Sequence, residues 1–245
     1  MIECRGVSKV YDRTAGRRFV RTSLSAWLRR ARPEPFHALD GVSFRLARGH
    51  SLAIVGANGA GKSTLLSLIA GISQPDAGSI SVEGSVAALL ELGSGFHPDL
   101  TGAENIRLNA SLLGLSRART AEMMDSIVEF SGLREFIDEP LRTYSTGMGA
   151  RLAFAVAVHV DPDILLIDEV FAVGDHAFQL KCTDRIRSFK QAGKTLVCVS
   201  HQSPLLEELC EEALWLDRGR VARYGSASDV IREYEAALPR TGGDL

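Results

Sequence analysis

The chain has 245 residues, of which 45% are hydrophobic and 24% are charged, and its formal net charge is -2. This is enough apolar sequence to form the core of one large domain or of two subdomains in contact. The chain as a whole is therefore not a disordered tail. The near-neutral charge gives no general attraction to nucleic acid, and we expect no nucleic-acid partner. The longest apolar run, residues 152–160, has about half of the roughly 20 residues that a membrane helix needs, so we do not expect the chain to span a bilayer.

The cysteines are scattered along the chain, with no C-x-x-C pair and no histidine at zinc-ligand spacing. They are Cys4, Cys182, Cys198 and Cys210. A zinc site or a disulfide framework is therefore not expected, and a reducing cytosol fits this pattern.

The first eleven residues predict a short strand that ends at Tyr11. Residues 13–37 differ in composition, because seven arginines occur there with no acidic residue between them and with apolar residues interleaved. We interpret this stretch as a basic insertion. Two interpretations account for this pattern equally well. The stretch is either a solvated surface loop or a contact with a membrane surface or a partner.

The next segment, "HALDGVSFRLARGH", predicts a hairpin with strands on both sides of Gly41. It is followed by a strand, "SLAIV", a glycine-rich loop, "GANGAGKS", and a helix that ends near Gly71. The loop fits the pattern G-x-x-x-x-G-K-[ST] in the strand-to-helix context that the pattern requires. Glycines let successive N–H groups point at a phosphate, and the helix start adds its positive dipole end.

We therefore predict that this loop binds a nucleoside triphosphate. Lys62 would meet the β- and γ-phosphates, and the hydroxyl of Ser63 would bind Mg²⁺. The complete set of expected phosphate-binding residues is Gly56, Ala57, Asn58, Gly59, Ala60, Gly61, Lys62, Ser63 and Thr64.

A helical block is predicted from about residue 101 to residue 160. Thr101 and Glu104 match a capping box at its start, and breaks are expected near Gly114, Gly132 and Pro140. Because the strands resume beyond this block, we interpret residues 95–160 as an inserted helical subdomain. From residue 163 strands and helices alternate, which predicts parallel βαβ units.

Two of these later strands end in chemically active residues. "DILLIDE" ends in Asp168 and Glu169 at the carboxyl end of an apolar strand, where α/β sheets bind ligands. Alone, such a pair indicates a helix cap. With the phosphate loop upstream we assign Asp168 to Mg²⁺ and Glu169 to the attacking water. "TLVCVSHQ" ends in Ser200 and His201, and we predict that His201 senses the γ-phosphate.

The segment "YSTGMGARLAFAVAV" resembles the signature motif of ABC ATPases, usually written LSGGQ. Ser145 and Gly147 match that motif, whereas Thr146 and Met148 depart from it. A serine and a glycine at a helix start form a second anion site. In the family this site serves the ATP of the partner subunit, so the resemblance implies a homodimer that encloses two nucleotides.

The same resemblance assigns further roles. Residues 172–175, "AVGD", match the family's D-loop, which places Asp175 at the dimer interface and near the nucleotide. Tyr11 corresponds to the aromatic that stacks on adenine, with an aromatic of residues 13–37 as the alternative. The family's Mg²⁺-contacting glutamine has no counterpart here. Glu91, displaced by one residue, is the nearest equivalent.

Three segments, "LLELGSGFHPDLTGAENI", "YSTGM" and "VFAVGDHAFQLKC", resemble the ABC ATPases that export lipid-linked polysaccharides in bacteria. The resemblance implies an α/β fold with a RecA-like phosphate-loop core, an N-terminal antiparallel β subdomain and the helical subdomain. We expect one nucleotide-binding domain over residues 1–240, a frayed end at 241–245 and no C-terminal carbohydrate-binding domain.

The function implied is hydrolysis of ATP, with Mg²⁺, to drive a separate permease at the cytoplasmic side of the bacterial inner membrane. Two permease copies are expected, and the permease would make most contacts with the glycan. Three alternatives remain open: the ATPase of an importer or of a small-molecule efflux system, a soluble ABC ATPase, and a phosphate-loop kinase.

Overall fold

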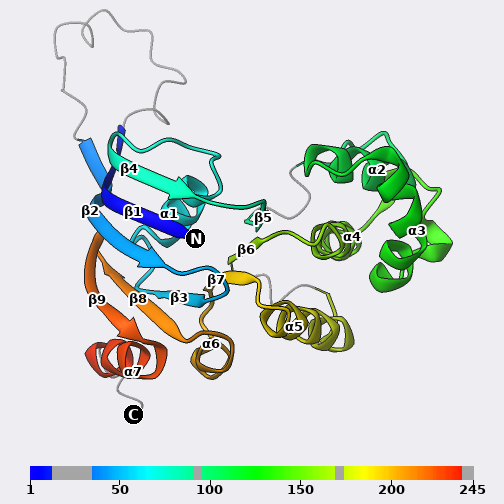
Figure 1. Ribbon diagram of the computed structural model, residues 1–245. Helices are drawn as coiled ribbons and strands as arrows, with labels where there is room; N and C mark the ends of the chain where they lie inside the picture. The colour runs from blue at the N-terminus through cyan, green and yellow to red at the C-terminus, as the bar shows by residue number, and fades with distance from the viewer. Residues whose placement is uncertain (13–34, 91–94, 169–173, 239–245) are drawn as a thin grey trace, which may run out of the picture.

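The computed structural model describes residues 1–12, 35–90, 95–168 and 174–238. Its strands form two sheets (Figure 1). The smaller sheet is antiparallel, and its strands in spatial order are β2 (Pro35–Leu46), β1 (Ile2–Asp12) and β4 (Ala77–Val82). The larger sheet contains, in spatial order, β5 (Val86–Leu89), β6 (Ile164–Asp168), β7 (Thr195–Val199), β3 (Ser51–Val55), β8 (Glu212–Asp217) and β9 (Arg220–Ser226). All its neighbours are parallel except β8 and β9.

The central strands of the larger sheet are buried on both faces. Every residue of β3 and β7 is buried, as are the four apolar residues of β6. Their sequences are continuous apolar runs, the composition typical of parallel strands that are covered on both sides. The expectation of parallel βαβ units is therefore confirmed.

Each face of the sheet carries its own core. One core joins the larger sheet to the antiparallel sheet and to α1 (Lys62–Ile69). The other is formed with α5 (His176–Gln191), α6 (Ser203–Leu209) and α7 (Ala227–Ala237). Figure 1 shows α5, α6 and α7 together on the side away from β4 and α1. The phosphate loop follows β3, and it therefore begins between these two cores.

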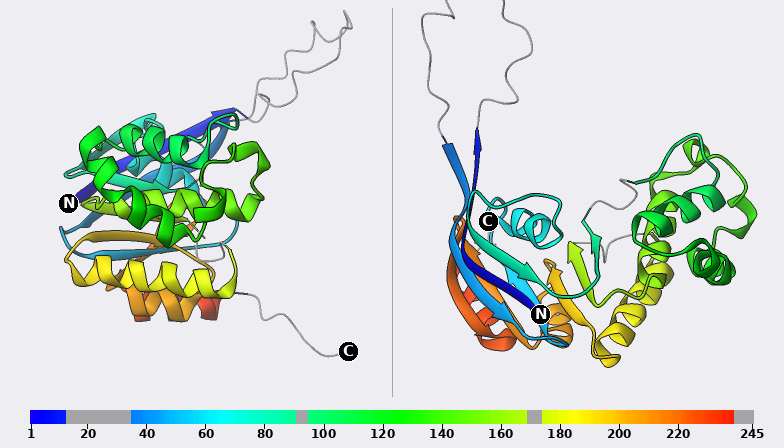
Figure 2. Two further views of the ribbon diagram at one scale, coloured as in Figure 1. Left: turned by 90° about the vertical axis from the view of Figure 1, so that its right-hand side faces the viewer. Right: turned by 45° about the horizontal axis from the view of Figure 1, so that its top comes forward.

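The helical subdomain stands to one side of both sheets (Figure 2). It contains α2 (Gly102–Leu112), α3 (Arg117–Ser131), two short 3-10 turns and α4 (Thr146–His159). The predicted capping box is present, because the Thr101 hydroxyl accepts from the Glu104 N–H and the Glu104 carboxylate accepts from the Thr101 N–H. The predicted breaks also lie between helices.

Helix α4 connects this subdomain to the sheet. Its Leu152, Ala155 and Val156 lie in the core of the subdomain, whereas Phe154 and Val158 lie in the core beneath the sheet. A helix that is apolar on all sides is buried on all sides. A displacement of α4 must therefore disturb both cores.

Two expectations about chain path need correction. The predicted hairpin around Gly41 is one continuous strand, β2, in which Gly41 has a φ of 68° close to an irregularity of the β1 register. A glycine marks a positive φ, and here that φ belongs to a bulge within the strand. The strand also begins at Pro35, so residues 35–37 are not insertion. Residues 13–34, Glu91, Glu169 and residues 241–245 lie outside the described residues.

Candidate functional site

The phosphate loop is shaped by glycines that have no room for a side chain. Gly56 has a φ of 150°, and a β-carbon there would lie 2.3 Å from the carbonyl oxygen of Leu216. Gly61, at the start of α1, has a φ of 105°, and a β-carbon would lie 2.4 Å from the carbonyl oxygen of Ala38. At these two positions the loop therefore fits against β8 and β2 only without a side chain.

Lys62 is held beneath this loop. Its Nζ donates to the carbonyl oxygens of Gly56 at 2.7 Å and of Ala57 at 3.2 Å, and the residue is only 8% exposed. Two backbone carbonyls thus hold the ammonium of Lys62 at the base of the loop. This is the arrangement that an anion-binding loop needs.

A cavity of about 330 Å³ lies in front of the loop. It is lined by Phe36, Ala38, Asn58, Gly59, Gly61, Lys62, Ser63 and Thr64. Six of the nine predicted phosphate-binding residues are in this wall. Of the other three, Ala60 is buried beneath the loop and Gly56 faces a second cavity described below. Backbone N–H groups, an ammonium and hydroxyls suit a polyphosphate.

Two aromatic residues lie side by side near this cavity. Tyr11 and Phe36 are cross-strand neighbours in the pairing of β1 with β2, and both are substantially exposed. Phe36 lines the cavity, whereas Tyr11 does not and instead has the ammonium of Lys9 5.6 Å from its ring centroid. Phe36 falls within residues 13–37, the alternative left open by the sequence. Within that range, its register opposite Tyr11 and its place in the cavity wall identify Phe36 as the candidate.

The carboxyl ends of three neighbouring strands meet beside the loop. Asp168 is the last residue of β6 and pairs in register with Val199 of β7, which is followed by Ser200 and His201. On its other side β7 pairs with β3, which leads into the phosphate loop. The predicted metal ligand, Asp168, and the predicted phosphate sensor, His201, thus lie at the same edge of the sheet. Asp168 lines neither the cavity in front of the loop nor the second cavity described below.

A second cavity, of about 160 Å³, also borders Lys62. Gly56, Lys62, Ser200 and His201 line it, together with Tyr234, Glu235 and Leu238 at the end of α7. Sequence reasoning missed this contribution of α7. The apolar spacing of Ala227, Val230, Ile231 and Tyr234 predicts a buried helix face but does not predict what the helix approaches.

The signature segment lies elsewhere. Ser145 is the N-cap of α4, and its hydroxyl accepts from the N–H of Met148 at 3.1 Å. Neither Ser145 nor Gly147 lines either of the two cavities at Lys62. Within one chain the structure does not join the signature to the phosphate loop.

Asp175 connects the signature helix to the core. It is the N-cap of α5, and its carboxylate accepts from the N–H of Phe178 at 2.9 Å. The same carboxylate lies 3.8 Å from the guanidinium of Arg151 on α4. Arg151 also donates to the carbonyl oxygen of Ser131 at 2.9 Å and lies over the ring of Phe178. This arginine of α4 thus contacts both α3 and α5.

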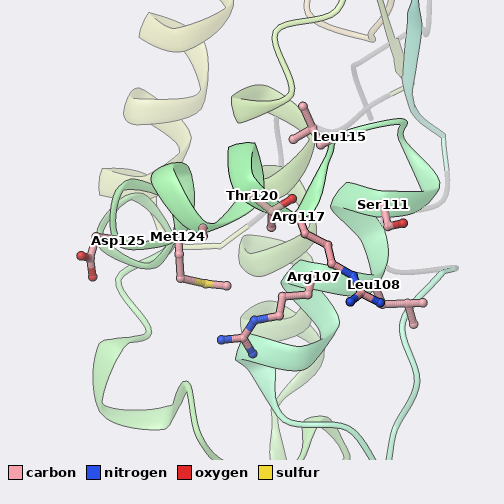
Figure 3. Close-up of a pocket in the computed structure, with 9 residues that line it drawn as sticks. Arg107, Leu108, Ser111, Leu115, Arg117, Thr120, Met124 and Asp125 are labelled. Atoms are coloured by element: carbon pink, nitrogen blue, oxygen red, sulfur yellow. The ribbon is translucent and has the colours of Figure 1, made fainter.

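The helical subdomain contains a further groove, of about 700 Å³, between α2 and α3 (Figure 3). Apolar side chains of Leu108, Leu115 and Met124 share its wall with the guanidinium groups of Arg107 and Arg117. Figure 3 shows the side chains of Arg107 and Met124 extending into the same space. The groove combines apolar surface with two guanidinium groups and one carboxylate, that of Asp125.

The described residues show neither a metal cluster nor a membrane helix. Within them, no group of three or more His, Cys, Asp and Glu side chains could hold a metal ion, and no helix is long and apolar enough to cross a membrane. The four cysteines are buried and free. Burial raises the pKa of the thiols of Cys4 and Cys182 to about 12, so these groups stay protonated.

These features define a phosphate-loop nucleotide-binding protein, and comparison with known proteins identifies its family. The sequence matches the ABC transporter family over residues 39–172, more than half of the chain. It is 52% identical over 201 residues to the O-antigen export system ATP-binding protein RfbB of Klebsiella pneumoniae, covering 82% of each chain. The chain therefore belongs to the ABC transporter family, as its motifs predicted, and it binds and hydrolyses ATP.

Further relatives and solved structures agree with this assignment. The teichoic acids export ATP-binding protein TagH of Bacillus cereus is 44% identical over 83% of this chain and 37% of its own length. A dimeric ATP-binding cassette bound to ADP and phosphate has a TM-score of 0.74 at 21% identity, covering 93% of this chain and 99% of that one. The expected fold class is confirmed.

Proposed function

We propose that this chain hydrolyses ATP to drive a separate membrane permease that exports a lipid-linked polysaccharide of the O-antigen, capsule or teichoic-acid type. The observation that carries this proposal is the similarity to O-antigen and teichoic-acid export ATPases over four fifths of the chain. Its place would be at the cytoplasmic side of the bacterial inner membrane, bound to the permease. No helix of the described residues could anchor it there by spanning the membrane.

The phosphate loop would bind the triphosphate through the cavity in front of Lys62. Lys62 already lies at the base of the loop, where its ammonium would exchange backbone carbonyls for phosphate oxygens. Phe36 in the wall of the cavity, or its neighbour Tyr11, would stack on adenine. The remaining loop residues, Gly56 to Thr64, would supply N–H groups and hydroxyls to the phosphates.

The residues at the strand ends suit Mg²⁺ and the hydrolysis step. The hydroxyl of Ser63 and the carboxylate of Asp168 are hard oxygen donors of the kind that Mg²⁺ prefers, and Glu91 is a further candidate ligand. Bound Mg²⁺ would neutralise charge that develops on the phosphates. Water attacks the γ-phosphorus to give ADP and phosphate, with Glu169 as the expected acceptor of its proton. His201 would donate to the γ-phosphate.

A second copy of the chain would complete the site. Ser145 and Gly147 line neither cavity of their own chain, yet they form the start of a helix suited to an anion. In a homodimer they would contact the partner's ATP, and Asp175 would lie at the interface. ATP would then hold two chains together, and hydrolysis would release them.

The groove between α2 and α3 suits the permease. It is large enough for side chains of a partner helix, and its apolar wall with two arginines favours an amphipathic segment that carries acidic residues. Helix α4 packs in both the core of the helical subdomain and the core beneath the sheet. A movement of the subdomain at this groove would therefore be transmitted through α4 to the sheet. We propose that two permease copies dock here, one on each chain.

The proposal is tested in the organism that carries the chain. When Lys62→Ala replaces the wild-type chain, we expect a lipid-linked glycan to accumulate on the cytosolic leaflet and the surface glycan to disappear. Lys181→Ala, an exposed substitution on α5, is the matched control and should leave the surface glycan unchanged. An unchanged surface glycan in the Lys62→Ala cells would contradict polysaccharide export.

A further inference from the structure

The tight turn between β8 and β9 lies beside the phosphate loop. Its two residues, Arg218 and Gly219, have positive φ values of 47° and 80°. The N–H of Gly219 donates to the carbonyl oxygen of Ala60 at 3.0 Å, and the carbonyl oxygen of Gly219 accepts from the N–H of Asp40 at 2.8 Å. Backbone contacts therefore fix this turn between the phosphate loop and β2.

Arg218 has a backbone conformation that is strained for an arginine. Two successive positive φ values belong to a type I′ hairpin turn, which Gly, Asn and Asp adopt most easily. In the part of the chain that the structure describes, the Arg218 guanidinium makes no hydrogen bond or ion pair, so no contact of the side chain there offsets the strain. The side chain is exposed, at the edge of a cavity of about 350 Å³ that Asp217 and Arg220 also line. Arg220 is already paired with Asp40, so Arg218 carries the available charge.

A turn of the opposite charge lies beside the signature. Asp138 and Glu139 are exposed, and among the described residues neither carboxylate makes an ion pair or accepts a hydrogen bond. Burial raises the pKa of the Tyr144 hydroxyl, and the negative charges of these two carboxylates raise it further. Because Tyr144 directly precedes Ser145, two available negative charges lie next to the start of α4.

This acidic turn, residues 136–140, has a fixed position. The N–H of Gly102 donates to the carbonyl oxygen of Glu139 at 3.2 Å, which joins the turn to the start of α2. The hydroxyl of Tyr144 donates to the carbonyl oxygen of Phe136 at 2.6 Å, which joins it to the segment ahead of α4. The two carboxylates are therefore carried as one unit with the signature.

In the homodimer proposed above, the phosphate loop of each chain faces the signature of the other. The turn beside the loop and the turn beside the signature then lie on facing surfaces, and their charges are opposite. Such complementarity steers association and fixes the register of two chains. The two-fold symmetry of a homodimer would form the contact twice.

We propose that Arg218 of one chain forms an ion pair with Asp138 and Glu139 of a second copy, beside the bound nucleotide. The inference rests on the proposed function, because it needs the ATP-dependent dimer. It adds to that dimer a contact between protein side chains, which the shared nucleotides do not supply. The pair also accounts for an arginine at a strained position.

The test measures dimerisation of the full chain with ATP, in a Glu169→Gln background that should retain ATP. Arg218→Glu brings like charges together twice in each dimer, so the Kd of the dimer should rise about tenfold at low ionic strength. Asp138→Arg combined with Glu139→Arg should have a similar effect. Reversing both turns in one chain should bring Kd back to within about threefold, and high salt should reduce all of these differences.

An ion pair within one chain provides the matched control. Arg119 and Glu122 pair at 2.9 Å on α3, and both side chains are more than half exposed. Arg119→Glu and Glu122→Arg reverse the same kinds of charge and should leave Kd unchanged. An unchanged Kd in Arg218→Glu would overturn the proposal, as would a loss that reversal of the acidic turn does not restore.

Cross-linking tests the contact directly. The four native cysteines are buried, so Arg218→Cys and Glu139→Cys in one chain introduce the exposed thiols. A short bis-maleimide should join two such chains with ATP and not with ADP, whereas Arg119→Cys with Glu139→Cys should give no covalent dimer.

The outcomes separate this contact from the dimer itself. If Glu169→Gln formed no dimer with ATP, the homodimer of the proposed function would fail. A normal ATP-dependent dimer without a cross-link through position 218 would overturn this contact alone. If Asp138→Arg with Glu139→Arg abolished the surface glycan while the dimer kept its Kd, the acidic turn would belong to the permease contact, and the proposal would be overturned.

Discussion

Position 56 has no room for a side chain, and this sets the shape of the phosphate loop. In Gly56→Ala the new β-carbon would have to displace the backbone carbonyl of Leu216, which lies 2.3 Å away. We expect a loss of at least about 2 kcal/mol in the free energy of unfolding together with loss of ATP binding. Urea unfolding and nucleotide titration measure the two effects.

Gly59→Ala is the control for this substitution. Gly59 also has a positive φ, 79°, but a β-carbon there meets no atom within 4 Å. It should cost only the backbone strain of about 1 kcal/mol and retain ATP binding. Equal effects of the two substitutions would show that φ, and not space, limits the loop.

The choice between two aromatic residues for adenine is also decided at single positions. Phe36 lines the nucleotide cavity and Tyr11 does not, so Phe36→Ala should raise KM for ATP by roughly tenfold, the loss of one stacked base. Tyr11→Ala should raise KM by less than about threefold, through its contact with Phe36 in the sheet. Steady-state kinetics measures both values of KM. A larger increase from Tyr11→Ala than from Phe36→Ala would identify Tyr11 as the residue that stacks on adenine.

At the scale of elements, Arg151 holds three helices together. Arg151→Ala removes a hydrogen bond to Ser131, an ion pair with Asp175 and the contact with the Phe178 ring. The ion pair is partly exposed and adds little, so the expected loss is about 1–3 kcal/mol, mainly from the hydrogen bond and the ring contact. Urea unfolding measures it.

The control for Arg151 is an exposed arginine of the same subdomain. Arg142 pairs with Asp99 at 2.8 Å, and both side chains are more than half exposed. Arg142→Ala should cost less than about 1 kcal/mol, as exposed ion pairs do. A similar loss from both arginines would show that Arg151 is an ordinary surface contact.

The start of α2 carries a pH-dependent contribution to stability. Hydrogen bonds from the backbone and side chain of Thr101 lower the pKa of the Glu104 carboxyl below its ordinary value. A lowered pKa in the folded state stabilises the fold above the ordinary pKa, and this contribution is lost as the pH falls through the lowered one. Wild type should therefore be more stable than Glu104→Ala at neutral pH, with the difference shrinking in acid. A difference that stays constant with pH would contradict this origin.

Most elements could be predicted because their signals are local. The capping box of Thr101 and the apolar runs of β3 and β7 depend on neighbours in the sequence. The prediction of a hairpin at Gly41 was wrong because a β-bulge can require a positive φ as much as a turn does. Phe36 falls within the range of the alternative, residues 13–37, but the sequence could not single it out, because its position depends on strand register. The approach of α7 to the cavity was not predicted, because it depends on the packing of the helix against Trp215, which no local pattern contains.

At the scale of the whole molecule, the separation of the signature from the phosphate loop predicts that ATP assembles two chains. Glu169→Gln should slow hydrolysis by orders of magnitude and so retain ATP. With ATP this variant should form dimers in light scattering, and with ADP it should be monomeric. Normal turnover of Glu169→Gln would reject its role as the base.

The same variant shows whether the signature makes the dimer. Ser145→Arg places a bulky side chain at the start of α4, outside both cavities of its own chain, so ATP binding by the monomer should remain. Added to Glu169→Gln it should abolish the ATP-dependent dimer, because the long side chain would occupy the place of the partner's phosphate. Ser81→Arg on β4, an exposed serine of the antiparallel sheet, is the control and should leave the dimer intact. A dimer that survives Ser145→Arg but not Ser81→Arg would place the contact between chains on the antiparallel sheet instead of the signature.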